Sequence, residues 1–361
     1  MDIKPYKVQA VAQMLETNTD TVRRYVSEAN IDVERQENGP RTRQFTLENV
    51  FELAAWRQAN RPKLNIKNRT VVGTIYAPKG GVGKTTITAN LACIFTMMGI
   101  KTLVVDIDFQ ANLTLAFDYD SEMTIEEAVA GNVDKEKVVE HHFGNLVPGW
   151  PTGRASLNDV VKKPFGEFGP HIIPADLTLD RLDTFLTFEA LQGLNSDLKI
   201  TAMIEEGLSG KNPNFDLSGY DLILFDAAPA KNRMTKGALL ASDFVISPVS
   251  MEKFSTKAIS YLSSVLNDMR ETTGRSPELL VVGNFNTPNR TRIINQVAVL
   301  SKEYPGALLD AAISRSEDFP KFLSLDEYMP PLVLAKPSGS SASELRSVAK
   351  ELLVKMGVID G

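Results

Sequence analysis

The sequence is poor in cysteine, because its 361 residues include only Cys93. A single thiol excludes an internal disulfide framework and a metal site built from several cysteines of one chain. Long apolar runs are also lacking, since no stretch approaches the roughly 18 residues that cross a bilayer. The N-terminal MDIKPYKVQA has no apolar segment typical of a signal peptide. We therefore expect a cytosolic protein with no membrane partner.

The charge of the chain is unevenly distributed. The net charge is −6, which by itself argues against a nucleic-acid binder. Residues 1–69, however, hold 12 Lys and Arg against 9 Asp and Glu, whereas the remainder holds 27 against 36. A basic head on an acidic body suggests two separate tasks, although a difference of this size also arises by chance.

A polar segment divides the chain into two regions. RPKLNIKN at 61–68 has no apolar periodicity and contains a proline, which is typical of a linker. We predict a head over 1–62, a linker over 63–70 and a body over 71–361. The length suits one large α/β domain together with a small one.

The head has the pattern of two helices joined by a tight turn. Apolar residues from Val8 to Leu15 fall at helical spacing, and TNTD at 17–20 supplies turn and N-cap formers. A second helix then turns the apolar residues of 22–26 inward. This layout is that of a helix-turn-helix, whose second helix offers its first turn to the DNA major groove. The predicted DNA contacts on its outer face are Thr21, Arg23 and Arg24.

A basic turn and a third helix complete the head. NGPRTRQ at 38–44 places Arg41 and Arg43 on a tight turn, as a small wing would, and Thr46 caps the next helix. TVRRY at 21–25 and RQFT at 43–46 resemble segments of the winged helix-turn-helix of MerR-type regulators. That resemblance implies DNA binding by the two basic elements. The alternative is a helical cap or dimerisation arm with solvated arginines.

A glycine-rich loop opens the body. KGGVGKTT at 79–86 follows an apolar, β-rich run at 71–77 and precedes a helical pattern at 87–98. Such a loop binds phosphate through backbone N–H groups at a helix N-terminus. We predict that Lys84 reaches the β- and γ-phosphates and that Thr85 ligates Mg²⁺. The predicted nucleotide-binding residues, for ATP or ADP, are Lys79, Gly80, Gly81, Val82, Gly83, Lys84, Thr85 and Thr86.

Carboxylates end two other apolar runs. DIDFQAN at 106–112 and DAAP at 226–229 each follow a predicted strand. In an open parallel sheet, the carboxyl ends of neighbouring strands face the ligand. We predict that Asp226 supports Mg²⁺ and that Asp108 is a functional residue near the phosphates, whereas Asp106 is structural.

These motifs together resemble those of the ParA/MinD ATPases. KGGVGKTT is similar to the deviant Walker A box of that family, DIDFQAN to its DxDPQxN segment and DAAP to its Walker B segment. PVSMEKFSTKA at 248–258 and ISR at 313–315 resemble later family segments, and Asn284 matches the asparagine that reads adenine. The resemblance implies a P-loop NTPase fold with a mostly parallel sheet flanked by helices.

The loop contains a second lysine, Lys79. Two ammonium groups about 5 Å apart repel by about 3 kcal/mol at an effective dielectric constant near 20, so they are unfavourable in one pocket. In the resembling family this lysine crosses to the nucleotide of the partner subunit. The resemblance therefore implies an ATP-bound homodimer in which Lys79, Lys84 and Asp108 serve catalysis, with Asp108 positioning the attacking water. A solvated lysine beside the loop is the alternative.

The resemblance also implies a function. In the family, the ATP-bound dimer binds DNA without sequence preference, and the candidate contacts here are Arg290, Arg292 and Arg315. We expect a partition ATPase that segregates plasmid or chromosomal DNA, is stimulated by a ParB-like adaptor, associates with the nucleoid and represses its own operon through the head. The alternatives are a nucleotide-responsive transcription regulator and a positioning ATPase for a protein cargo.

The last predicted helix carries an apolar stripe between Leu345 and Met356. Such a stripe either packs on the body or binds a membrane surface. We expect it to pack on the sheet, because the helix has no Trp or Phe.

Overall fold

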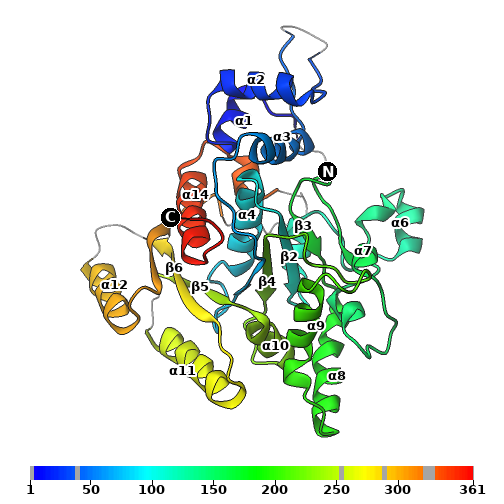
Figure 1. The fold of residues 1–361 in the computed structure, drawn as a ribbon, viewed down its shortest axis with the longest axis vertical. Helices are drawn as coiled ribbons and strands as arrows, with labels where there is room; N and C mark the ends of the chain where they lie inside the picture. The colour runs from blue at the N-terminus through cyan, green and yellow to red at the C-terminus, as the bar shows by residue number, and fades with distance from the viewer. Residues whose placement is uncertain (1–3, 37–40, 252–255, 287–290, 320–329, 361) are drawn as a thin grey trace.

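A seven-stranded sheet forms the centre of the body (Figure 1). The computed structural model describes residues 4–36, 41–251, 256–286, 291–319 and 330–360. All strand pairs within these ranges are parallel, in the order β3-β2-β4-β1-β5-β6-β7. The strands are β1 (Val71–Ile75), β2 (Thr102–Ile107), β3 (His171–Ile173), β4 (Leu222–Ala227), β5 (Phe244–Ser250), β6 (Glu278–Asn286) and β7 (Leu308–Ser314).

The central strands are continuous apolar runs because both faces of the sheet are covered. Alternate side chains of a strand point to opposite faces. In β4, Leu222 and Leu224 therefore join one hydrophobic core, whereas Ile223 and Phe225 join the other. The predicted parallel sheet with helices on its faces is confirmed.

Helices flank the sheet on both sides. The core on one face includes residues of α4 and α14, and the core on the other includes residues of α9, α10 and α11. The helices of the body are α4 (Lys84–Met97), α5 (Asn112–Ala116), α6 (Ile125–Gly131), α7 (Leu157–Val160), α8 (Asp180–Leu191), α9 (Lys199–Leu208), α10 (Arg233–Ala241), α11 (Thr256–Thr273), α12 (Thr291–Glu303), α13 (Leu332–Ala335) and α14 (Ser340–Lys355), with short 3₁₀ turns η1 (Lys135–Lys137), η2 (Phe143–Leu146), η3 (Leu177–Leu179) and η4 (Ser196–Leu198).

The apolar stripe of α14 lies inside the protein. Leu345, Val348 and Leu352 are each fully buried and belong to the same core as α4. The expectation that this helix packs on the body is confirmed. Across the described residues, no helix is both long and apolar enough to cross a membrane.

The described residues of the head form three helices, α1 (Val8–Met14), α2 (Thr19–Ala29) and α3 (Leu47–Asn60). The side chain of Asn18 caps α2 by accepting a hydrogen bond from the Thr21 N–H at 2.8 Å. Thr46 caps α3 in a capping box with Asn49, as its place before the helical pattern predicts. The predicted inner face of α2 is buried, and its members are Val22, Tyr25 and Val26.

A short antiparallel pairing connects α2 to α3. Arg35 pairs with Arg43, and the Gln44 N–H donates to the Glu34 carbonyl at 2.8 Å. The residues between the paired segments, 37–40, lie outside the described ranges. The described part of the predicted basic turn thus belongs to a small antiparallel hairpin.

The segment between head and body lies against the C-terminal end of the chain. Ile66 pairs with Ile359, the Lys67 N–H donates to the Val358 carbonyl at 3.0 Å, and Leu64 packs against the core of the body. The segment over 63–70 is therefore held by backbone pairing as well as by side chains. The predicted domain boundaries stay predictions.

Candidate functional site

The phosphate loop joins β1 to α4. Gly83 is the N-cap of α4 and has a φ of 84°, and Gly81 has a φ of 70°. Both values lie in the left-handed region that glycine adopts without steric cost. A Cβ at Gly83 would lie 2.6 Å from Asn284 Nδ2, so this position also requires glycine for space. The loop leaves the backbone N–H groups at the start of α4 available for an anion.

Lys84 begins α4 and points into the protein. Its side chain is 8 % exposed. Burial lowers the pKa of its ammonium group, although the nearby carboxylates of Asp226 and Asp108 act in the opposite direction. The predicted phosphate lysine and the two predicted carboxylates therefore lie close enough to influence one another's charge.

Asp226 ends β4 beneath the phosphate loop. The Thr85 hydroxyl donates to its Oδ2 at 2.7 Å and the Thr88 hydroxyl donates to its Oδ1 at 2.8 Å. Burial raises the pKa of Asp226 to about 6, against the lowering effect of the two hydroxyls and of Lys84. The structure brings together the two predicted Mg²⁺ ligands, Thr85 and Asp226, and their hard oxygen atoms are the donors that Mg²⁺ prefers.

Asp106 organises the turn that carries Asp108. The buried carboxylate of Asp106 accepts hydrogen bonds from the Thr114 N–H at 2.9 Å, the Thr114 hydroxyl at 2.8 Å and the Asp108 N–H at 3.1 Å. Burial, together with the neighbouring carboxylate of Asp226, raises the pKa of Asp106 to about 8. Asp108 itself is half-exposed and accepts from the Gln110 N–H at 3.1 Å. Asp106 thus has the contacts of a structural residue.

Asn284 reaches the phosphate loop from β6. Its buried side chain donates from Nδ2 to the Val82 carbonyl at 2.8 Å. The next residue, Phe285, has a φ of 52°, which is unusual for a residue with a side chain. Asn284 therefore lies against the phosphate loop, and its contact with adenine stays a prediction.

Lys79 directly precedes the glycines of the loop, and Thr86 lies in the first turn of α4. The side chain of Lys79 is exposed, and within the described ranges no ion pair or side-chain hydrogen bond of Lys79 is present. Thr86 is half-buried and its carbonyl accepts from Asn90 Nδ2 at 2.7 Å. The two lysines of the loop thus occupy different environments, one buried beside carboxylates and one in solvent.

Two threonines at the site were not predicted from the sequence. Thr88 lies one helical turn after Lys84 and holds Asp226, and Thr114 holds Asp106. Helical periodicity places residues i and i+4 on the same face, so Thr88 could have been found from its spacing. Thr114 follows Asp106 by eight residues, and no local pattern predicts that contact.

The predicted DNA contacts of the head lie on its surface. Arg23 pairs with Asp20 at 2.6 Å, and the Arg24 guanidinium lies 5.5 Å from the centre of the Tyr25 ring. Arg41 is exposed and Arg43 is half-exposed, both in the second segment of the hairpin. The basic residues of α2 and of the hairpin therefore both reach solvent.

The predicted DNA contacts of the body are only partly described. Arg290 lies outside the described residues, as do 252–255 of the family-like stretch at 248–258. Arg292 belongs to α12, but its side chain is not among the described parts of the structure. The Arg315 N–H donates to the Asn286 carbonyl at 3.1 Å.

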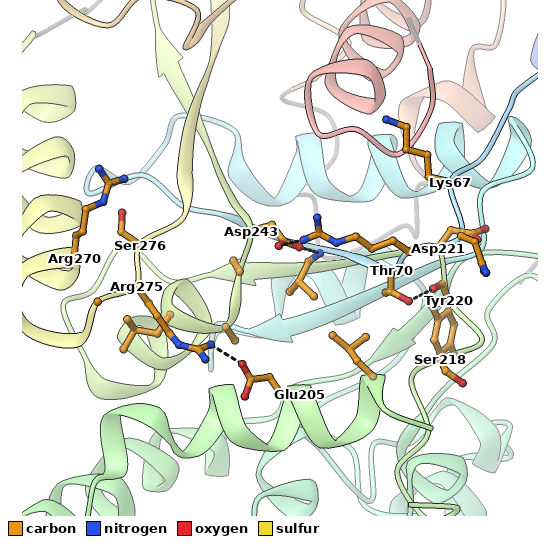
Figure 2. Close-up of a pocket in the computed structure, with 18 residues that line it drawn as sticks. Lys67, Thr70, Glu205, Ser218, Tyr220, Asp221, Asp243, Arg270, Arg275 and Ser276 are labelled. Carbon is orange, nitrogen blue, oxygen red and sulfur yellow. Dashed lines mark hydrogen bonds and ion pairs between the residues drawn. The ribbon is translucent and has the colours of Figure 1, made fainter. Parts of the chain in front are cut away.

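A polar cleft of about 830 Å³ lies at the opposite ends of the strands (Figure 2). Its residues Thr70, Asp221 and Asp243 directly precede β1, β4 and β5. Arg69 pairs with Asp243, and Arg275 pairs with Glu205 of α9 at 2.6 Å (Figure 2). Because these charges satisfy one another away from the phosphate loop, we do not assign the nucleotide to this cleft.

Known proteins resemble the chain in sequence. A family model described as an AAA domain matches residues 70–279. The chain is 26 % identical to protein IncC of Escherichia coli over 282 residues, which cover 78 % of this chain and 68 % of IncC. It is 28 % identical to the chromosome-partitioning ATPase Soj of Thermus thermophilus over 281 residues, which cover 77 % of this chain and 93 % of Soj.

Solved structures resemble the chain in fold. Cobyrinic acid a,c-diamide synthase of Mycobacterium smegmatis, with a bound ATP analogue and magnesium, has a TM-score of 0.59 at 18 % identity, with 79 % of this chain and 95 % of that chain covered. A putative plasmid partition protein of Borrelia burgdorferi bound to AMPPNP has a TM-score of 0.56 at 20 % identity, with 80 % and 99 % covered.

The parallel sheet, the phosphate loop and the buried Asp226 define a P-loop nucleoside triphosphatase. The AAA-domain match spans more than half of the chain, and the sequence relatives include partition ATPases. The chain belongs to the ParA/MinD-type ATPases of that family. It is therefore an ATPase.

Proposed function

We propose that the protein is a partition ATPase that segregates plasmid or chromosomal DNA. In this proposal, ATP binding closes a homodimer in the cytoplasm. The dimer binds the DNA of the nucleoid without sequence preference, and a ParB-like adaptor stimulates ATP hydrolysis. The head binds the operator of the protein's own operon and represses it. The similarity to the chromosome-partitioning ATPase Soj and to the putative plasmid partition protein of Borrelia burgdorferi supports partition as the task.

The different environments of the two loop lysines carry this proposal. Lys84 is buried beside Asp226 and Asp108, so it serves the nucleotide of its own subunit. Lys79 is exposed on the same loop. A cation presented outward at the edge of a nucleotide site is available to a second triphosphate, where it stabilises the charge of phosphoryl transfer as an arginine finger does. Nucleotide binding is thereby linked to dimerisation.

The remaining site residues divide the chemistry among them. The backbone of 80–86 cradles the phosphates, and Lys84 neutralises their charge. Thr85 and Asp226 would hold Mg²⁺, which would offset the negative charge of the phosphates. Asp108, half-exposed on a turn fixed by Asp106, accepts a hydrogen bond from the attacking water and orients it. Asn284 supports the loop from β6.

The surface of the head supports a DNA-binding role. Thr21, Arg23 and Arg24 lie in the first turns of α2, and Arg41 and Arg43 lie in the hairpin that follows. The first turn of such a helix is the part that enters the major groove, and an adjacent basic hairpin suits the phosphate backbone. We assign the operator contacts to these five residues and the non-specific contacts to Arg290, Arg292 and Arg315.

Binding to two DNAs in three nucleotide states tests the proposal. Fluorescence anisotropy is measured with a duplex of random sequence and with the DNA upstream of the protein's own gene, each without nucleotide, with ADP and with ATPγS. The random duplex should bind only in the presence of ATPγS. The upstream DNA should also bind without nucleotide or with ADP. Because phosphate contacts release counterions, the random binding should weaken steeply with salt. Absence of nucleotide-dependent random binding would contradict the partition role.

The basic surface of the head favours one second candidate, a nucleotide-responsive transcription regulator. A regulator of this kind would bind the upstream DNA and show no ATP-dependent affinity for random duplex. A positioning ATPase for a protein cargo would bind random duplex and ignore the upstream DNA. The same anisotropy measurements therefore separate the three functions.

A further inference from the structure

A buried arginine joins the phosphate-loop helix to the head. Arg57 of α3 is 4 % exposed. Its Nη1 donates to the Leu15 carbonyl at 2.6 Å, and its Nη2 donates to the Met97 carbonyl at 3.0 Å. Leu15 is the C-cap of α1, and Met97 is the last residue of α4. Helix C-termini carry unpaired carbonyls and partial negative charge, so one guanidinium satisfies two helix ends at once.

The helix α4 connects this contact to the nucleotide site. It begins at Lys84 in the phosphate loop, and its 14 residues span about 21 Å. Because the backbone hydrogen bonds of a helix make it move as a unit, a shift at its phosphate end displaces Met97 as well. The turn after α4 is held closely too, since a Cβ at Gly99 would lie 2.5 Å from the Cβ of Gln58 on α3.

The segment after Asp108 also reaches α3. It continues through α5 to Phe117, whose ring centre lies 5.8 Å from that of Phe165. The Phe165 ring in turn stacks on Phe51 of α3, with ring centres 5.6 Å apart. The helix α3 thus contacts α4 directly through Arg57, and Phe51 and Phe165 link it indirectly to the segment after Asp108.

We propose that α3 couples the nucleotide site to the head and that Arg57 is the positioning residue of this coupling. Nucleotide binding shifts the end of α4, Arg57 carries the shift to the end of α1, and the position of α1 against α2 changes the DNA-reading surface. Arg57 itself contacts neither nucleotide nor DNA. The DNA part of this inference rests on the proposed function of the head, whereas the contact between α4, Arg57 and α1 does not.

Thermodynamic linkage makes the proposal measurable. If nucleotide changes the affinity for upstream DNA by some factor, the DNA changes the affinity for nucleotide by the same factor, and such factors are typically about 5 to 150. We expect a factor in this range for the wild-type chain with ATPγS, measured in both directions. In Arg57→Met, the coupling factor should fall to about 1 to 2, so that nucleotide hardly changes the affinity for upstream DNA. The affinity of this variant for nucleotide in the absence of DNA should be unchanged.

Two further variants separate coupling from folding. Lys350→Ala is the matched control, because Lys350 also connects the body to the head by an ion pair with Glu16 at 2.7 Å. This ion pair lies on the surface, where such pairs contribute little to stability. Lys350→Ala should keep the wild-type factor. Arg57→Lys retains a buried positive charge, but the lysine ammonium reaches only one of the two carbonyls at a time. This variant should therefore fold, even if Arg57→Met unfolds, and should show an intermediate coupling factor between nucleotide and upstream DNA.

A readout without DNA keeps the inference distinct from the function of the head. Hydrogen exchange of the full chain should show that ATPγS with Mg²⁺ changes the protection of α1 amides in the wild type and in Lys350→Ala, changes it less in Arg57→Lys, and does not change it in Arg57→Met. If α1 responds but no upstream DNA binds, the operator role fails and the coupling stands. If α1 does not respond in the wild type, or responds equally in the Arg57 variants, the inference is overturned.

Discussion

Removing the Thr88 hydroxyl should shift the pH dependence of Mg²⁺–nucleotide binding. Thr88 donates to the buried Asp226 carboxylate at 2.8 Å. Burial raises the pKa of Asp226 to about 6, and the hydrogen bonds from Thr85 and Thr88 keep it from rising further. Thr88→Val preserves the shape of the side chain and deletes one of these donors.

The size of the shift follows from the hydrogen bond. A hydrogen bond to a charged group contributes about 1.5–3 kcal/mol, and one pKa unit corresponds to about 1.4 kcal/mol. The pKa of Asp226 in Thr88→Val should therefore rise by about 1 to 2 units. A carboxylate must be ionised to hold a metal ion, so binding is lost as the pH falls through this pKa. The affinity of the wild type for Mg²⁺–nucleotide should fall below about pH 6. The affinity of Thr88→Val should already fall below about pH 7 to 8.

Calorimetric titration with ATPγS and Mg²⁺ over this pH range measures the midpoint. Thr96→Val is the matched control, because Thr96 lies on the same helix and donates only to the Ala92 carbonyl at 2.9 Å. Its midpoint should equal that of the wild type. An unshifted midpoint in Thr88→Val, or an equal shift in both variants, would refute the reasoning.

Three other variants test the rest of the nucleotide site and the DNA surface of the head. Lys84→Ala removes the buried cation beside Asp226 and should abolish ATP binding in equilibrium dialysis; retained binding would exclude its phosphate role. Gly83→Ala places a Cβ at a φ of 84° and 2.6 Å from Asn284 Nδ2, so we expect a loss of about 1–2 kcal/mol in unfolding free energy and weaker nucleotide binding, measured by denaturation and calorimetry. Arg23→Ala combined with Arg24→Ala should lose upstream-DNA binding and keep ATP-dependent binding to random duplex, and equal loss of both would contradict separate DNA surfaces.

Local patterns in the sequence predict the parts of the fold that local physics determines. The strand, glycine turn and helix around Lys84 were predictable, because apolar runs and glycine spacing act over a few residues. The cap at Thr46 and the inner face of α2 were predictable for the same reason. Asp226 followed from its place at the end of an apolar run, since parallel strands present their carboxyl ends to the ligand.

Contacts between distant segments were not predictable from one sequence. Arg57 is one of several arginines in a basic head, and only the packing of α3 on α4 shows that it is buried and bonded to two helix ends. The pairing of Ile66 with Ile359 joins segments that are far apart in the sequence. Neither the periodicity nor the composition of these segments indicates that they pair. The order of the strands depends in the same way on crossover connections that no local motif encodes.

The dimer assignment depends on Lys79, and sedimentation velocity tests it most directly. Wild type and Lys79→Gln are compared with no nucleotide, ADP and ATPγS, after calorimetry has established nucleotide affinity for each. We predict that ATPγS converts the wild type into a dimer, whereas Lys79→Gln binds ATPγS with unchanged affinity and remains monomeric. A Lys79→Gln protein that dimerises with ATPγS as the wild type does would contradict the role of Lys79 at the partner's nucleotide.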